Sequence, residues 1–243
     1  MVAGELLGVR AELVDVNLLQ GEHLQPEFLK VRADGELCKP DAACMVACEL
    51  LAVRAELVDV NLLQGEHLQP EFLKINPIHT IPVLEDGGLA IHDSHAILMY
   101  LADAYGKQES LYPREPRQRA LVNQKLFFNS SILFPRLRNI TYPLIIEGVK
   151  EIPQKGLDAI EEAYGFLEEF LSRSRHLAGD DVTIADIAAY ATVTSLELLL
   201  PLNAQKYPKT QAWLKALEKL PAVQKCNAKG VEDLKQFINS KLA

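Results

Sequence analysis

Asp93 and Ser94 form the part of this sequence best suited to bind a ligand. They stand where a helix N-cap is expected, directly before apolar residues at helical spacing. The N-terminus of a helix binds anions such as carboxylates, because its first backbone N–H groups lack partners within the helix. Upstream, Pro82 lies in a run of β-branched and apolar residues. Since proline has no backbone N–H, Pro82 marks an edge strand, or a place where the backbone meets something other than a strand.

Two short strands and a helix are predicted to position these residues. The strands are expected at Thr80–Leu84 and Leu89–Ile91, joined by a turn from Glu85 to Gly88, and the helix follows Asp93. An open backbone edge beside a helix N-terminus can pair with a peptide and bind its carboxylate. Each feature taken alone favours the plain structural reading, a proline-kinked edge strand and an ordinary capped helix.

The sequence NPIHTIPVL followed by DSHAI resembles the glutathione site of the cytosolic glutathione transferases, most of all the insect delta and epsilon classes. The resemblance implies that Pro82 is a cis-proline, which turns the Ile81 backbone toward the cysteinyl unit of glutathione. It also implies that Ser94 holds the γ-glutamyl carboxylate and Asp93 its ammonium, with the upstream histidines near the glycine end. The full set of glutathione-binding residues that it implies is His67, His79, Thr80, Ile81, Pro82, Asp93, Ser94 and His95.

The composition bounds the class of protein. Apolar residues make up 49% of the 243 residues and charged residues 24%, which is ordinary for a globular chain. The formal net charge of −8 argues against a nucleic-acid surface. No apolar run is long enough for a membrane span, and no secretory signal is apparent, so we expect no membrane partner and a cytoplasmic location. Free thiols are then expected for the four cysteines.

An internal repeat precedes the ligand-binding stretch. Met1–Val31 recurs as Met45–Ile75, with differences only at Gly4/Cys48, Gly8/Ala52 and Val31/Ile75. A recent duplication of a coding segment and an error in the gene model both stay open as its origin. The domain has room for one copy. We expect the second copy to occupy it, because that copy continues directly into residue 76 and closes no long loop. The first copy also carries a helix-weakening glycine at Gly8, which costs about 0.8–1 kcal/mol relative to alanine.

Cys38 takes the position of the catalytic serine when residues are counted along the family pattern. The strand before it is then Leu29–Ala33, which Lys30 and Arg32 interrupt, whereas a buried parallel strand is usually continuously apolar. In the family the serine hydroxyl donates to the glutathione sulfur and favours the thiolate, while a cysteine S–H is a weak donor.

Three outcomes stay open for this cysteine. Cys38 leaves a slow transferase, or it makes a cysteine-type thiol transferase that holds glutathione as a mixed disulfide, or the protein is a non-catalytic relative. A metal site built from Cys38, Cys44 and Cys48 lacks a fourth ligand and is disfavoured, so no metal is expected.

Residues 105–112 form a polar linker, and only helices are predicted beyond it. The expected helices are Glu115–Arg138, Leu157–Leu171, a helix from Thr183 to Leu200, Ala212–Leu220 and Val231–Leu242. Thr183 and Asp186 form a predicted capping box at the start of the third. The first helix is expected to bury Leu121, Leu126, Phe128, Ile132 and Leu133, and the second to expose Glu161, Glu162, Glu168 and Glu169 to solvent.

Together these patterns and the resemblance predict an α/β thioredoxin-like N-terminal domain followed by an all-α helical domain. The expected segments are a surplus duplicated segment 1–31, a glutathione-binding domain 32–104, a linker 105–112 and a helical domain 113–243. The implied function is conjugation of glutathione, the co-substrate, to small hydrophobic electrophiles in detoxification, by a homodimer. The acceptor-substrate residues that the resemblance implies are Phe134, Leu137, Arg138 and Thr141.

Overall fold

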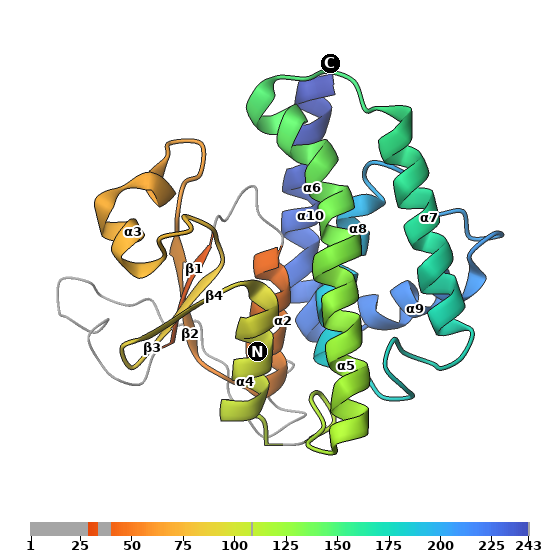
Figure 1. The fold of residues 1–243 in the computed structure, drawn as a ribbon, viewed down its shortest axis with the longest axis horizontal. Helices are drawn as coiled ribbons and strands as arrows, with labels where there is room; N and C mark the ends of the chain where they lie inside the picture. Colours follow the sequence, from red (N-terminus) through yellow and green to blue (C-terminus); the bar gives the residue numbers. More distant parts are fainter. Residues whose placement is uncertain (1–28, 34–39, 108, 243) are drawn as a thin grey trace.

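The computed structural model describes residues 29–33, 40–107 and 109–242. Residues 1–28, which hold most of the first copy of the repeat, and Cys38 lie outside the described residues. Figure 1 shows a small sheet-containing domain beside a larger bundle of helices. The expected α/β thioredoxin-like domain followed by an all-α domain is therefore confirmed.

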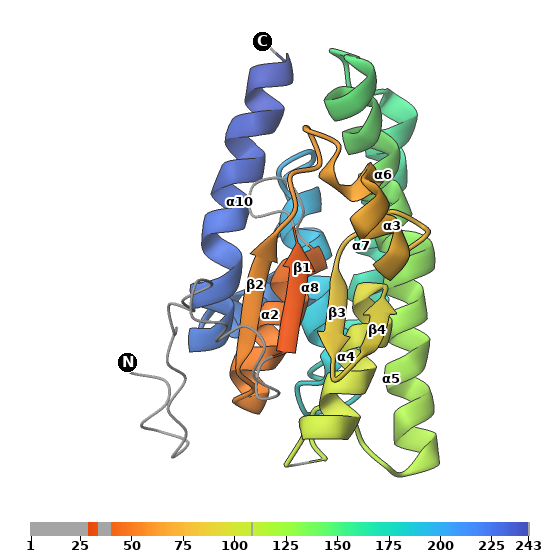
Figure 2. The same ribbon diagram turned by 90° about the vertical axis from the view of Figure 1, so that its left-hand side faces the viewer.

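The sheet has the strand order β2-β1-β3-β4, in which β1 is parallel to β2 and antiparallel to β3. Helices α2 and α4 separate the sheet from the helical domain, whereas α3 lies on the opposite side (Figures 1 and 2). The second copy of the repeat supplies the end of α2, β2, η3 and α3. The element bounds are β1 Leu29–Ala33, α2 Pro40–Leu51, β2 Ala55–Asp59, η3 Glu66–Leu68, α3 Pro70–Ile75, β3 Val83–Asp86, β4 Leu89–His92 and α4 Ser94–Tyr105.

Strand β1 is an interior strand even though polar residues interrupt it. Leu29 and Val31 are buried in the main core, to which α2 also contributes. Side chains alternate along a strand, so Lys30 and Arg32 point to the α3 side of the sheet. There the Arg32 Nε donates to Glu85 Oε1 at 2.6 Å, from the neighbouring strand β3. The ion pair gives the charged side chain of Arg32 a partner on the neighbouring strand.

The predicted hairpin exists, but its boundaries differ from those expected. Strand β3 begins at Val83, directly after Pro82, and only Gly87 and Gly88 form the turn. Both glycines have positive φ, 53° and 91°, a conformation that suits tight hairpin turns and that glycine adopts freely. Asp86 is the last residue of β3, paired with Leu89 of β4, and its carboxylate accepts hydrogen bonds from two tyrosines of α4, Tyr100 and Tyr105.

The first helix of the helical domain runs nearly continuously from Pro116 to Glu147, and so extends beyond the predicted Glu115–Arg138. Two π-helical turns, η4 and η5, interrupt it. Helix α10 begins well before the predicted Val231, at Pro221, and packs against α2. The bounds are α5 Pro116–Phe128, η4 Asn129–Leu133, α6 Phe134–Tyr142, η5 Pro143–Glu147, α7 Gln154–Leu171, α8 Ile184–Leu196, α9 Pro208–Glu218 and α10 Pro221–Leu242.

The predicted inward face of the first helix is wrong at one position. Leu126 and Leu133 are buried, but Leu121 is 48% exposed and Val122 is buried in its place. At about 100° per residue, Leu121 and Leu126 project about 140° apart, so one buried stripe cannot hold both. The buried side chains instead recur three or four residues apart, as at Val122, Leu126 and Asn129.

The acidic residues of α7 do more than face solvent. Glu168 caps the first turn of α9, because its carboxylate accepts from the backbone N–H groups of Lys209 and Thr210, both at 2.9 Å. Glu161 accepts from the hydroxyl of Tyr207 at 2.8 Å. The interpretation of this row as a solvated face is therefore wrong at two positions, which join α7 to the segment that enters α9.

Helix α8 starts with the predicted capping box. The Asp186 carboxylate, fully buried, accepts from the Thr183 backbone N–H at 2.9 Å. It also accepts from the Leu177 backbone N–H and from the Trp213 indole Nε1, both at 2.9 Å. Four hydrogen bonds, one of them from the Thr183 hydroxyl, offset the cost of burying this carboxylate. The helix is buried nearly all round, as its apolar sequence predicts.

Candidate functional site

Helix α4 places Asp93 and Ser94 at its N-terminus, as the sequence predicts. Asp93 is the N-cap, with φ of 75°, and its Oδ1 accepts from the backbone N–H of His95 at 2.8 Å. Ser94 is the first helical residue and is only 9% exposed. The Cys44 thiol of α2 lies 3.9 Å from the Ser94 carbonyl oxygen, so α2 packs against this end of α4.

His95 connects this helix end to the helical domain. Its Nδ1 lies 3.0 Å from Asp93 Oδ1, and its Nε2 lies 2.9 Å from Nδ2 of Asn129 in η4. The hydrogen bond from His95 is the main cause that lowers the pKa of Asp93 below its usual value. Asp93 is therefore an ionised carboxylate at neutral pH, and its side chain is 55% exposed. It is available to a cationic group.

The Ile81–Pro82 peptide bond is cis, as the resemblance implied. Asn76, fully buried, holds the loop that leads to it: its Nδ2 donates to the Thr80 carbonyl oxygen at 2.7 Å, and its Oδ1 accepts from the Ile78 N–H at 3.1 Å. The sequence patterns did not identify Asn76 or Asn129 as residues that hold the site in place. The signal that would have found them is an amide side chain in an otherwise apolar stretch, since a buried amide needs several partners.

The two upstream histidines lie beside each other on the same domain. His79 is exposed, with φ of 51°, in the loop before the cis-proline, and His67 lies in η3. Their ring centroids are 6.2 Å apart. This spacing allows both rings to reach one end of an extended ligand. Their contact with the glycine end of glutathione stays a prediction.

The four predicted acceptor-site residues all belong to α6. Phe134 is partly buried, Leu137 is 6% exposed and belongs to the hydrophobic core, and the Thr141 hydroxyl donates to the Leu137 carbonyl oxygen at 3.0 Å. Arg138 is exposed, with its guanidinium 4.9 Å from the ring centroid of Tyr142. Of the four, Arg138 is the side chain most open to a ligand.

Cys38 lies outside the described residues, so its role stays a prediction. Helix α2 is described from Pro40. Cys48 and Cys226 are free cysteines. Within residues 29–33, 40–107 and 109–242, no group of three His, Cys, Asp or Glu side chains is arranged to hold a metal ion. The helices of these same ranges include none whose length and apolar character would let it cross a membrane.

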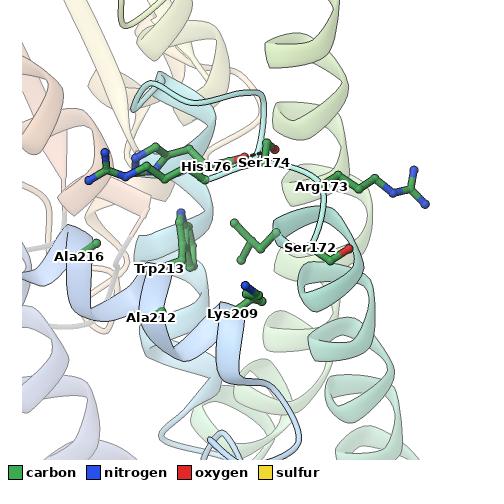
Figure 3. Close-up of a pocket in the computed structure, with 10 residues that line it drawn as sticks. Ser172, Arg173, Ser174, His176, Lys209, Ala212, Trp213 and Ala216 are labelled. Carbon is green, nitrogen blue, oxygen red and sulfur yellow. Dashed lines mark hydrogen bonds between the residues drawn. The ribbon is translucent and has the colours of Figure 1, made fainter.

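A cavity of about 420 Å³ lies away from this site, between the segment that follows α7 and the helix α9 (Figure 3). Two of its buried lining residues face Asp186 of the capping box. The Trp213 indole donates to Asp186 Oδ1, and His176 Nδ1 lies 3.7 Å from the same oxygen. Arg173, which points away from the cavity in Figure 3, pairs with Glu169 at 2.6 Å. Trp213 and Arg173 of this lining are thus committed to contacts within the fold.

The fold and the capped helix beside a cis-proline define a thioredoxin-like domain of the kind that binds glutathione, fused to a helical domain. Residues 39–103 match the family model described as "Glutathione S-transferase, N-terminal domain", and residues 100–221 match "Glutathione S-transferase, C-terminal domain". The chain is 41% identical over 233 residues to "Glutathione S-transferase 1" of Manduca sexta, covering 96% of this chain and 87% of that protein.

Solved structures similar to this chain belong to the same family. An epsilon-class glutathione S-transferase from the housefly, Musca domestica, superposes with a TM-score of 0.85 and 42% identity, covering 88% of this chain and 98% of that one. A glutathione transferase homologue from Drosophila mojavensis, with bound glutathione, gives a TM-score of 0.84 and 38% identity, covering 88% and 97%. The chain belongs to the glutathione S-transferase family. The expected enzyme class, with glutathione as co-substrate, is confirmed.

Proposed function

We propose that this enzyme binds glutathione at the N-terminus of α4 and transfers its sulfur to small hydrophobic electrophiles. The observation that carries the proposal is the pairing of the buried Ser94 with the exposed, ionised Asp93 at one helix end. The γ-glutamyl group of glutathione carries a carboxylate and an ammonium on one carbon. The Ser94 hydroxyl donates to the carboxylate at the positive end of the helix dipole, and the ammonium donates to the Asp93 carboxylate.

The rest of glutathione extends from this helix end along the loop that precedes β3. The Ile81 backbone receives the cysteinyl unit, with Thr80 and Pro82 beside it, while His67 and His79 receive the glycine carboxylate. The position of the two histidine rings, 6.2 Å apart, supports this direction. Imidazole N–H groups are suitable donors to a terminal carboxylate.

The electrophile binds against the outer side of α6, near Phe134, Leu137, Arg138 and Thr141. The hydrogen bond between His95 and Asn129 supports this arrangement, because it ties the glutathione-binding helix end to η4, which leads directly into α6. The exposed guanidinium of Arg138 supplies a positive charge that favours a nearby thiolate. Leu137, at 6% exposure, contributes mainly by holding α6 in place.

Cys38 supports a second candidate function. Thiol–disulfide exchange through a mixed disulfide with glutathione requires a cysteine where most members of these insect classes carry serine, and this chain has one. We also propose a cytoplasmic location, as for the cytosolic glutathione transferases that the sequence resembles. A homodimer that removes electrophiles is the assembly we propose, supported by the exposed apolar side chains of Leu121 and Phe127 on α5.

Ser94→Ala tests the glutathione site. The substitution removes the hydroxyl that meets the carboxylate, so glutathione affinity should fall by about 1–2 kcal/mol, a factor of about 5–30. Calorimetric titration with glutathione measures it. Ser240→Ala, which removes an exposed hydroxyl at the end of α10, is the matched control and should leave the affinity unchanged. Equal affinities for the parent and the Ser94 variant would rule out this placement of glutathione.

A further inference from the structure

The imidazole of His95 is hydrogen-bonded at both of its ring nitrogens. Nδ1 lies 3.0 Å from Asp93 Oδ1 at the same helix end, and Nε2 lies 2.9 Å from Nδ2 of Asn129 in η4. With the amide nitrogen turned toward the ring, Nε2 accepts, and a neutral ring keeps its proton on Nδ1, where it donates to Asp93. In this state the histidine orients the Asp93 carboxylate without neutralising its charge.

The amide of Asn129 has a second hydrogen-bonding state available to it. Asn129 is 3% exposed, and in the described part of the chain its buried Oδ1 has no hydrogen-bond partner. Turning the amide over exchanges Oδ1 and Nδ2, which have nearly the same size. Either orientation satisfies one amide atom through His95 and leaves the other atom without a partner. The two orientations are therefore similar in free energy, and the protonation state of the ring decides between them.

A proton on Nε2 of His95 selects the turned amide. An imidazolium donates from both ring nitrogens, so Nε2 then needs an acceptor, and Oδ1 of the turned Asn129 amide supplies it. Nδ1 keeps its hydrogen bond to Asp93, which becomes an ion pair between two full charges. Because the positive ring offsets the negative charge of Asp93, the same carboxylate attracts the ammonium of a ligand less strongly.

Within residues 29–33, 40–107 and 109–242, Asp93 is the only charged side chain that pairs with His95. Helix α4 packs against α2, α8 and the hairpin of β3 and β4. The Cys44 thiol of α2 lies against the Ser94 carbonyl, and His92 of β4 is exposed. Burial raises the pKa of the Cys48 thiol and of the Tyr190 hydroxyl to about 12, so both stay neutral.

The charged side chains on these elements, and on α5 beside Asn129, have partners of their own. They are Glu49 with Lys225, Glu85 with Arg32, Asp86 with Tyr100 and Tyr105, Asp103 with Arg119, Asp186 with Trp213, and Lys125 with the ring of Phe170. The charge that Asp93 presents to a ligand therefore depends chiefly on whether His95 is protonated.

We propose that His95 and Asn129 are positioning residues that make the affinity for glutathione depend on pH. With a neutral His95, the full charge of Asp93 is available to the γ-glutamyl ammonium. With a protonated His95, Asp93 is paired within the protein and the affinity falls. The inference rests on the proposed placement of glutathione at Asp93 and Ser94.

The sign of the pH dependence separates His95 from the other groups of the site. Histidine side chains take up a proton between about pH 5 and 8, and Asp93 stays ionised there because the hydrogen bond from His95 lowers its pKa. The affinity should therefore fall as the pH decreases through this range. Protonation of His67 and His79 gives the opposite sign, since positive rings attract the glycine carboxylate more strongly.

Calorimetric titration with S-methylglutathione at about pH 5.5 and about pH 8 tests the inference. This ligand has both charged ends of glutathione but no thiol, so ionisation of the sulfur cannot contribute. Its affinity should be about three- to tenfold weaker at the lower pH, and binding at intermediate pH should release a fraction of a proton to the buffer. An affinity that is equal at the two pH values, or higher at the lower one, would overturn the inference. No saturation by about 10 mM ligand at either pH would overturn the proposed glutathione site itself, and the inference with it.

Three variants assign the effect to these residues. His95→Gln replaces the ring by an amide that does not titrate, so the fall in affinity at low pH should disappear or reverse. Asn129→Asp gives Nε2 a charged acceptor, which should keep the ring protonated and the affinity weak at both pH values. His92→Gln, at an exposed position directly before Asp93, is the matched control and should keep the pH dependence of the parent. A purely structural role of His95 would lower the affinity by the same factor at both pH values, so a parent-like pH dependence in His95→Gln would overturn the inference.

Discussion

His95 Nε2 lies 2.9 Å from Asn129 Nδ2, and this contact joins the helix end that carries Ser94 to the helical domain. With the amide nitrogen of Asn129 turned toward the ring, Nε2 accepts and the proton of a neutral imidazole is on Nδ1. Nδ1 then donates to Asp93 Oδ1 at 3.0 Å. One buried amide of the helical domain thus fixes the ring that orients a carboxylate of the thioredoxin-like domain.

Asn129→Ala should therefore weaken both folding and glutathione binding. Removing one hydrogen bond in a buried position should lower the free energy of unfolding by about 1–2 kcal/mol. The effects of Asn129→Ala and His95→Ala should not add, with a coupling of about 0.5–1.5 kcal/mol, since both remove the same bond. Urea unfolding of the two single variants and the double variant measures the coupling. Strict additivity would contradict the contact.

Local patterns in the sequence predicted the parts of the site that depend on local chemistry. The N-cap at Asp93 and the capping box of Thr183 and Asp186 both appear where expected, because a short polar side chain and its own helix decide them. The π-helical turn at Asn129 was not predictable. Such a turn depends on what α5 and α6 pack against, and no residue type demands it.

The repeat shows how far tertiary context can override sequence. Leu29-Lys30-Val31 forms most of strand β1, whereas its counterpart in the second copy, Leu73-Lys74-Ile75, ends helix α3. The two tripeptides differ by one methylene, so no intrinsic preference separates them. Both copies carry the same proline three residues earlier, Pro26 and Pro70, so the proline does not separate them either. Pairing with β2 and β3 on both sides is what favours the strand at Leu29–Ala33.

Because β1 begins at Leu29, the surplus part of the first copy is predicted to end at residue 28 rather than 31. Removal of residues 1–28 should leave the melting temperature unchanged or slightly higher, since the second copy supplies β2 and α3. Thermal unfolding of the shortened chain measures it.

Removal of residues 1–30 is the matched comparison, because it also deletes the buried Leu29. Burying a leucine side chain contributes about 1.5–3 kcal/mol, so this second truncation should be less stable by a similar amount. Destabilisation by the shorter truncation would mean that the first copy is integrated into the fold.

Cys48 should make the free energy of unfolding fall as the pH rises through the alkaline range. Burial, with the neighbouring Cys226 acting in the same direction, raises the pKa of Cys48 to about 12. The unfolded thiol ionises from about pH 8.5, so the unfolded state releases its proton first and stability falls as pH rises toward 12. The parent should lose about 1.4 kcal/mol per pH unit above about 8.5 relative to Cys48→Ala. Guanidinium unfolding at pH 8 and pH 10.5 compares them, and parallel pH dependences would refute the assignment.

Cys38 is predicted to decide which sulfur chemistry the enzyme performs. In the serine members of the family a hydroxyl donates to the glutathione sulfur, while a thiol donates weakly and is itself a nucleophile. Two adjacent thiolates repel, so at most one of Cys38 and glutathione should be ionised near neutral pH. The parent should therefore conjugate slowly and exchange disulfides measurably. Cys38→Ser should raise conjugation of a chloro-nitroaromatic by about tenfold, as glutathione sulfur displaces chloride, and should abolish exchange.

Chloride release and reduction of a mixed disulfide by glutathione measure the two activities separately in each variant. Cys226→Ser, which replaces a partly buried thiol on α10, is the matched control and should change neither. Glutathione affinity should stay the same in both variants, because we propose that Ser94 and Asp93 bind the other end of the tripeptide. Lys39 and Pro40 follow Cys38 where the family pattern has two prolines, so the gain should be smaller than in a serine enzyme. If Cys38→Ser leaves both activities as they are in the parent, Cys38 does not face the glutathione sulfur.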